Sequence, residues 1–177
     1  AFAWSGRMGY LGPGTWYTRK AESGGMIVDL NIHDLDLLRW LCGDVESVYA
    51  ECSRRLFQDL DIFNNAWIAI RFKGGGIGMV GGSWISRFWH TIFGLIGEKG
   101  SVTKEGDSLK TQFGVEGLKV IQVDQAVRAL VEEDRAFIQS ISGKPTMIAT
   151  AEDGTEALRL ALGAEESFRM GKPIKIR

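Results

Sequence analysis

The stretch 24–42 carries hydrophobic residues at the spacing of a helix that packs one side against a core. Its apolar positions are Leu30, Leu37, Leu38 and Leu41. Ser23 is placed to cap the first turn with its hydroxyl, and Gly43 is placed to end the helix at C′. Asp29 and His33 are four residues apart, so we expect them to share one face of this helix, one turn from each other.

After this helix, apolar and polar residues alternate in several short runs, as strands require. In 45–55, for example, Val48, Ala50 and Cys52 would point to one side of a sheet. The predicted strands are 45–55, 66–72, 77–86, 88–96, 101–103 and 115–123. Glycine-rich turns join them, which predicts an antiparallel meander. Residues 1–22 are rich in glycine and aromatic residues and predict loops with at most one short strand.

Two further helices are predicted near the end of the chain. The first covers about 124–142 and stops at Gly143 and Pro145. Its apolar stripe is Val127, Leu130, Val131, Phe137, Ile138 and Ile141. The second begins after Thr150 with a capping box and ends near Gly171. Helices around a run of strands indicate an α+β fold, an open and mostly antiparallel β-sheet with helices packed on one face.

Composition narrows the possible classes of protein. The chain has 177 residues, of which 45% are hydrophobic and 24% charged, the balance of one soluble globular domain. The net charge of −1 offers no basic field for nucleic acid or an anionic membrane, and no apolar run reaches the ~20 residues of a bilayer span. No signal peptide is visible, and two cysteines without metal-ligand spacing suggest reduced thiols. We therefore expect a cytoplasmic protein with no nucleic-acid partner, no membrane partner and no metal.

One glycine motif resembles a nucleotide-binding fingerprint, but the residues around it argue against that interpretation. The segment 76–81 satisfies G-x-G-x-x-G, and Glu98 follows at about the distance of the acidic residue in a dinucleotide fingerprint. Such glycines must open a helix, whose N-terminus binds the pyrophosphate. Here an aromatic-rich strand pattern follows them, so the sequence predicts no cofactor-binding residues in this chain.

The Asp29–His33 pair is the main candidate for chemistry. A carboxylate that orients an imidazole is a general-base arrangement. The same spacing also occurs on solvated polar faces, and a histidine can equally be satisfied inside a helix–sheet contact. Near the N-terminus, Trp16 and Arg7 could line the edge of a polyol or sugar pocket, although ordinary packing over the sheet edge explains them as well.

The helix resembles the one that opens the C-terminal domain of the glucose–fructose oxidoreductase / inositol dehydrogenase (Gfo/Idh/MocA) family. The matching residues are Gly24, Gly25, Asp29, His33, Asp36, Trp40 and Gly43. Further blocks resemble the family's small-residue strand (82–84), its glycine hairpin (94–102) and its C-terminal helices (137–174). Asn31 departs from the pattern, because many members have Gly there, and this difference would alter the substrate side of the helix.

The resemblance implies an NAD(P)-dependent dehydrogenase that transfers a hydride between a sugar or polyol hydroxyl, such as that of an inositol, and nicotinamide. Residues 1–177 would be a single C-terminal substrate-binding and oligomerisation domain. An N-terminal Rossmann domain, absent from this chain, would precede it in the parent protein and bind NAD or NADP. His33 would be the general base, Asp29 would orient it or hold a substrate hydroxyl, and Asn31 would lie on the substrate side.

Two non-enzymatic alternatives remain open at this point. The chain could be a ligand-binding or dimerisation module of an inactive family member, or a lone sugar-binding protein. For the chain alone we expect no enzymatic activity and no bound NAD(P). The resemblance also implies a homodimer or tetramer built on the open face of the sheet, the face that the helices leave uncovered.

Overall fold

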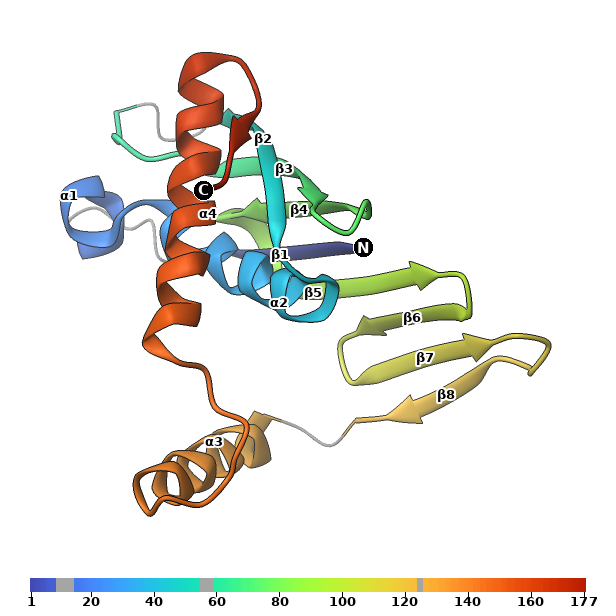
Figure 1. The fold of residues 1–177 in the computed structure, drawn as a ribbon. Coiled ribbons are helices and arrows are strands. Elements are labelled where there is room, and N and C mark those ends of the chain that lie inside the picture. The colour runs from blue at the N-terminus through green and yellow to red at the C-terminus, as the bar shows by residue number, and fades with distance from the viewer. Residues whose placement is uncertain (9–14, 55–58, 124–125) are drawn as a thin grey trace.

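The computed structural model describes residues 1–8, 15–54, 59–123 and 126–177, and Figure 1 shows its fold. The strands are β1 (Phe2–Met8), β2 (Val45–Ser53), β3 (Asn65–Phe72), β4 (Ile77–Ser83), β5 (Ile85–Gly97), β6 (Gly100–Glu105), β7 (Ser108–Phe113), β8 (Lys119–Gln122) and β9 (Ile174–Lys175). The helices are a 3-10 turn (Trp16–Thr18), α1 (Lys20–Ser23), a π-turn (Ile27–Asn31), α2 (Ile32–Cys42), α3 (Ala126–Ile141) and α4 (Ala151–Met170). These elements confirm the predicted α+β class.

All nine strands form one sheet in the order β8-β7-β6-β5-β1-β4-β3-β2-β9. Neighbours pair antiparallel except β1 and β4, which run parallel. The predicted uninterrupted meander is therefore wrong at one point, because β1 lies between β4 and β5. Alternation in the glycine-rich start of the chain is too weak to show a strand at the centre of the sheet. In Figure 1 the sheet extends to one side as β6, β7 and β8, which we call the wing.

The helices α2 and α4 and the π-turn pack on one face of β1–β4, and this layer encloses the core. Its fully buried side chains include Leu35 and Leu38 of α2, Ile68 of β3 and Val80 of β4. Among the described residues, the core takes no member from the wing or from α3. The molecule thus has a well-packed body and two elements that extend from it.

The π-turn changes which side of the predicted helix is buried. The amide of Ile32 donates to the carbonyl of Ile27, five residues earlier, so one extra residue enters the turn. Leu30 stays buried, but the next buried leucines are Leu35 and Leu38, whereas Leu41 is exposed. The predicted stripe is therefore confirmed at Leu30 and Leu38 and wrong at Leu41, and it did not include the buried Leu35. The predicted end of the helix at Gly43 is confirmed, with φ 87° and its amide bonded to the Arg39 carbonyl.

Ser23 does not cap the long helix as predicted, because it is the last residue of α1. Its hydroxyl accepts a hydrogen bond from the Gly25 amide at 3.0 Å and so stabilises the bend between α1 and the π-turn. Gly24 and Gly25 have φ of 74° and 84°, the left-handed region in which glycine is favoured. The glycine pair is therefore needed for the sharp approach to the π-turn.

The strand predicted for 115–123 is confirmed only at 119–122, as β8, and the sequence did not predict β7. The chain makes a hairpin there, β7 followed by β8, and Gly114 turns the chain with φ 53°. Residues 115–118 belong to the turn, since the Glu116 amide donates to the carbonyl of Phe113. The strand β7 has few apolar residues, so its alternation was hidden in the sequence.

The two C-terminal helices lie where they were predicted. The capping box of α4 is confirmed, because the Thr150 hydroxyl accepts from the Asp153 amide and the Asp153 carboxylate accepts from the Thr150 amide. Arg39 of α2 donates to the same carboxylate at 3.1 Å, which ties α2 to the start of α4. In Figure 1 α3 lies next to the start of α4, apart from the sheet. None of the helices in the described ranges is long and apolar enough to cross a membrane.

The sheet face opposite α2 and α4, which we call the open face, carries aromatic side chains. A Cβ atom on Gly81 would lie within 3 Å of both Trp4 and Trp67, so both indoles lie against this glycine. His90 of β5 lies beside Trp4, with ring centroids 5.6 Å apart, and Phe88 lies beside His90. Trp84, which follows β4 directly, is 1% exposed and belongs to the core.

The contact between the π-turn and the sheet depends on a glycine. A Cβ atom on Gly82 would lie 2.3 Å from Nδ2 of Asn31, far inside van der Waals contact. We predict that Gly82→Ala lowers the free energy of unfolding by about 1–3 kcal/mol, the usual cost of overpacking. Urea denaturation measures this change. The control is Gly74→Ala, where a Cβ atom would meet nothing within 4 Å. Equal stability of the two variants would contradict the tight contact.

One carboxyl group is also buried in this layer. Asp34 of α2 accepts a hydrogen bond from the Ser5 hydroxyl of β1 at 3.1 Å, and its Oδ2 atom is buried with no hydrogen-bond partner in the described part of the chain. Burial raises the pKa of Asp34 to about 6, while the Ser5 hydrogen bond and the charge of His33 act in the opposite direction. The folded protein therefore holds this proton more tightly than the unfolded chain does.

We predict that this proton makes stability depend on pH. Its stabilisation is complete below the ordinary aspartate pKa and is lost as the pH rises through about 6. In Asp34→Asn, the free energy of unfolding relative to wild type should therefore rise between pH 4 and pH 6, by about 3 kcal/mol at most. Ser5→Ala should extend the slope to higher pH, because it removes the bond that lowers this pKa. Denaturation at several pH values tests this, and parallel curves for wild type and Asp34→Asn would contradict it.

Candidate functional site

The π-turn is the structural centre of the candidate site. It replaces the first turn of the predicted helix and contains both Asp29 and Asn31. Short π segments inside helices are rare and frequently occur at functional sites. The glycine bend at Gly24 and Gly25 precedes the turn, and the amide of Asp29 donates to the Gly25 carbonyl at 2.9 Å. The backbone therefore places this turn by its own hydrogen bonds.

Asp29 is half-buried on the π-turn, and His33 is exposed on the first turn of α2. A π-turn has more residues per turn than the 3.6 of an α-helix, so residues four apart come closer to one full turn. This geometry agrees with a shared face for the two side chains. The His33 imidazole is open to solvent on the outer side of α2, where a small molecule could reach it.

Asn31 points the other way. It is 0% exposed, and its amide lies against Gly82 of β4. Both polar atoms of this amide are buried without a hydrogen-bond partner among the described residues. Buried amides normally find a partner, and an internal water molecule is the usual one where protein groups are lacking. The side chain thus lies in the helix–sheet contact, and contact with a substrate stays a prediction.

Asp34 is a residue that the sequence reasoning missed. It follows His33 directly and faces β1, where Ser5 is the register partner of Gly82. Asn31 and Asp34 are three apart and so lie side by side above this Ser5–Gly82 pair. The i, i+3 spacing of two polar residues on a buried helix face was a usable signal. The position of β1 was needed to see what they face.

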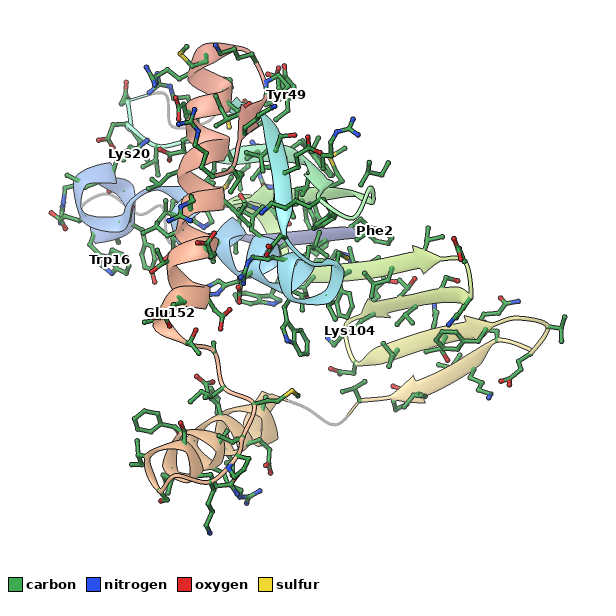
Figure 2. All side chains as sticks on the ribbon, viewed as in Figure 1. Phe2, Trp16, Lys20, Tyr49, Lys104 and Glu152 are labelled. Atoms are coloured by element: carbon green, nitrogen blue, oxygen red, sulfur yellow. The ribbon has the colours of Figure 1, made fainter. Side chains whose placement is uncertain are left out.

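The other predicted binding residues are less clearly placed. Trp16 is 45% exposed and stacks on Tyr17 with ring centroids 3.8 Å apart. Tyr17 in turn meets Trp84 edge to face, so the aromatic rings run from the surface to the core. Figure 2 shows Trp16 near α1 and the start of the π-turn. Arg7 lies on β1, but its side chain falls outside the described residues.

Among the described residues, neither the glycine segment 76–81 nor a metal site adds to the chemistry at His33. The strand context predicted for the 76–81 glycines is confirmed, since most of the segment forms β4. Within the described ranges, no three His, Cys, Asp or Glu side chains lie together as a metal would require. A hollow of about 660 Å³ lies between α4 and β9, but none of the predicted site residues lines it. The site is therefore an exposed helix face with the His33 imidazole and, one turn before it, the Asp29 carboxylate.

Comparison with known proteins relates this geometry to a family. A family model described as the GFO/IDH/MocA C-terminal domain matches residues 1–103, more than half of the chain. Myo-inositol 2-dehydrogenase of Thermotoga maritima is 27% identical over 168 residues, which cover 87% of this chain and 50% of that protein. The scyllo-inositol 2-dehydrogenase (NAD(+)) of Bacillus subtilis is 29% identical over 167 residues, with 88% and 48% covered. The chain thus spans about half the length of these curated relatives.

A solved structure supports the same assignment at the level of the fold. Levoglucosan dehydrogenase in complex with NADH superposes with a TM-score of 0.89 at 17% identity, over 99% of this chain and 57% of that chain. The chain therefore belongs to the GFO/IDH/MocA family of oxidoreductases, and its residues 1–103 match the C-terminal domain of that family.

Proposed function

We propose that this chain is the substrate-binding and catalytic-histidine domain of an NAD(P)-dependent dehydrogenase acting on a sugar or polyol hydroxyl, with an inositol as the model substrate. The observation that carries the proposal is the π-turn that places half-buried Asp29 one turn from exposed His33. The names of the relatives support the class of substrate, because they act on inositols and levoglucosan. NAD or NADP would be bound mainly by the other half of the parent protein.

In the proposed reaction His33 takes the proton of the substrate hydroxyl while the carbon gives its hydride to nicotinamide. The exposed imidazole can reach a substrate that approaches the outer side of α2. Asp29 either orients the imidazole or holds a neighbouring hydroxyl of the polyol. Asp34 acts below them, as a buried group that holds α2 on β1 through Ser5.

The competing function is a non-catalytic ligand-binding or dimerisation module. It needs the same fold, but it gives no reason for an exposed histidine next to a half-buried carboxylate on a π-turn. A lone sugar-binding protein is weaker still, because the hollow between α4 and β9 contains none of the predicted site residues. The enzyme interpretation therefore accounts for more of the structure.

Histidine substitutions in the full-length polypeptide test the proposal. We predict that His33→Ala and His33→Asn each lower kcat by about 10²–10⁴-fold, the contribution of a positioned general base, and leave cofactor binding intact. Asp29→Asn should cost less in kcat, or mainly raise KM if it holds a hydroxyl. The double variant should be non-additive with the single variants, because the two side chains act together. Steady-state kinetics with myo-inositol and NAD⁺ or NADP⁺ measures these effects.

The second histidine of the chain is the matched control. His90 lies on the open face of β5, beside Trp4, and not on α2. His90→Ala should keep kcat within about threefold of wild type. A His33→Ala enzyme that stays within the same range, with its fold intact by circular dichroism, would refute the catalytic assignment.

We also propose that the domain forms a homodimer or tetramer through its open face. Trp67 is 53% exposed there, and Met79 and Phe88 are exposed on the same side. The indoles of Trp4 and Trp67 both lie against Gly81, which has no side chain of its own on this face. Such a face in water favours burial against a second copy, and sheets pack well about 10 Å apart.

A charge placed on this face should weaken the association. We predict that Trp67→Glu raises the Kd of the homodimer at least about tenfold, because it would bury a charge in an apolar interface. The control is Trp40→Glu, at a tryptophan that is 66% exposed on the outer side of α2. Sedimentation of the 177-residue chain at micromolar concentrations measures both variants. A wild-type chain that stays monomeric at high micromolar concentration would contradict the proposal.

A further inference from the structure

Asn31 lies beneath the two residues of the candidate site. It comes two residues after Asp29 and two residues before His33, and two residues of a helix span about half a turn. Its side chain therefore points away from theirs, into the contact with the sheet, where it is fully buried. Whatever fixes Asn31 also fixes the directions in which Asp29 and His33 leave the backbone.

The part of the sheet that Asn31 meets is held on both sides. Gly82 of β4 pairs with Ser5 of β1 and with Ala66 of β3. A Cβ atom on Gly82 would lie 2.3 Å from Nδ2 of Asn31 and 2.8 Å from both Cγ and Oδ1. The whole amide group thus occupies the space of a side chain at Gly82. Asn31 therefore sets how closely the π-turn approaches a fixed part of the sheet.

The two ends of the π-turn differ in how the backbone holds them. At the start, the Asp29 amide donates to one carbonyl, that of Gly25. At the end next to His33, the Ile32 amide is shared between the carbonyls of Ile27 and Leu30. A shared hydrogen bond fixes the backbone less firmly than one well-aligned bond. The contact of Asn31 with β4 therefore matters most for the end that carries His33.

The amide group of Asn31 makes this contact through its volume. Neither Oδ1 nor Nδ2 has a hydrogen-bond partner among the described residues. Side chains that are kept for their hydrogen bonds normally show them when they are buried. The close packing against Gly82 is thus the interaction that the geometry assigns to Asn31.

We propose that Asn31 is a positioning residue, a spacer between the π-turn and β4 that sets where Asp29 and His33 stand relative to a substrate hydroxyl. The inference rests on the proposed function, in which His33 takes the proton. A general base needs the right geometry, and a misplacement of about 1 Å can lower the rate about 10²-fold. With a smaller side chain at position 31, the π-turn would move toward β4 and take His33 with it.

Direct contact with the substrate is the competing role for Asn31. It would need the amide on the outer side of α2, where His33 is exposed, whereas the amide is buried on the inner side. Asn31→Ala separates the two roles in the full-length polypeptide. A spacer predicts a fall in kcat of about 10- to 100-fold with KM within about threefold of wild type. A rise in KM without a fall in kcat would identify a substrate contact and overturn the inference.

The space that Asn31 and Gly82 share allows a compensation experiment. Asn31→Ala empties this space, and Gly82→Ala puts a methyl group where the amide lies. Each single variant should lower kcat about 10- to 100-fold. The double variant should recover most of this loss, because the methyl group at position 82 fills the space that the amide has left. Single variants with the kcat of wild type, or losses that simply add in the double variant, would refute the spacer.

The control is a core truncation away from the π-turn. Val48 is buried on β2, and β3 separates that strand from β4. Val48→Ala should lower the urea concentration at which the protein unfolds and keep kcat within about threefold of wild type. An equal loss of kcat in this control would show that the Asn31 effect reflects general destabilisation.

Asn31→Leu separates volume from hydrogen bonding. Leucine has the same branching and the same number of side-chain heavy atoms as asparagine, but no polar atom. For a spacer, we expect kcat within about threefold of wild type and unfolding at the same or a higher urea concentration, because two unpaired polar atoms are removed. A loss of kcat as large as that of Asn31→Ala would show that the polar atoms of Asn31 are needed, and would overturn the inference.

The position of His33 can also be followed without activity. The chain has two histidines, His33 and His90, so the NMR signals of their imidazoles are readily assigned. In the 177-residue chain, Asn31→Ala should shift the His33 signals and leave those of His90 unchanged, and the double variant should restore them. Unchanged His33 signals would refute the spacer alone. Shifted signals in a protein whose activity does not depend on His33 would refute the proposed function alone.

Discussion

The close approach of the π-turn to the centre of the sheet is the contact on which the rest of this structure depends. It requires a glycine on β4, because the Asn31 amide occupies the space of a side chain at Gly82. It also requires β1 to lie between β4 and β5, so that Ser5 can meet the carboxyl group of Asp34. Because the π-turn lies against the sheet in this way, one side of α2 packs into the core. His33 is left on the other side, accessible to a substrate.

The contact has a polar cost that the apolar core must offset. Four side-chain atoms of Asn31, Asp34 and Trp84 are buried in the described structure without a hydrogen-bond partner. Each such atom costs roughly 1–3 kcal/mol if it stays unpaired. Internal water can recover much of this cost, since these residues lie in one layer between the helices and the sheet. A polar cluster beneath a candidate catalytic turn fits the general finding that local rules are broken most often at functional sites.

Local patterns predicted much of this fold, and non-local pairing explains the rest. The capping box of α4, the end of α2 at Gly43 and the strands from 45 to 97 follow from nearby residues. The place of β1 depends on partners some eighty residues away, for which its own sequence has no signal. The π-turn has no strong local signature either, and it moved burial from Leu41 to Leu35. For the same reason the burial of the Asn31 side chain against β4 was not predicted, and Asp34 was overlooked.

One face of the sheet is covered by α2 and α4 of the same chain and the other is the open face, and this difference has a consequence for how the protein would respond to dilution. A contact between two copies is bimolecular, so its occupancy falls as the protein is diluted. A contact between two parts of one chain, such as a helix and the sheet that it covers, has an effective concentration set by the segment that joins them. Dilution therefore leaves this contact unchanged. The two faces of this one sheet would therefore come apart under different conditions. The site at His33 belongs to the side that does not depend on how much protein is present.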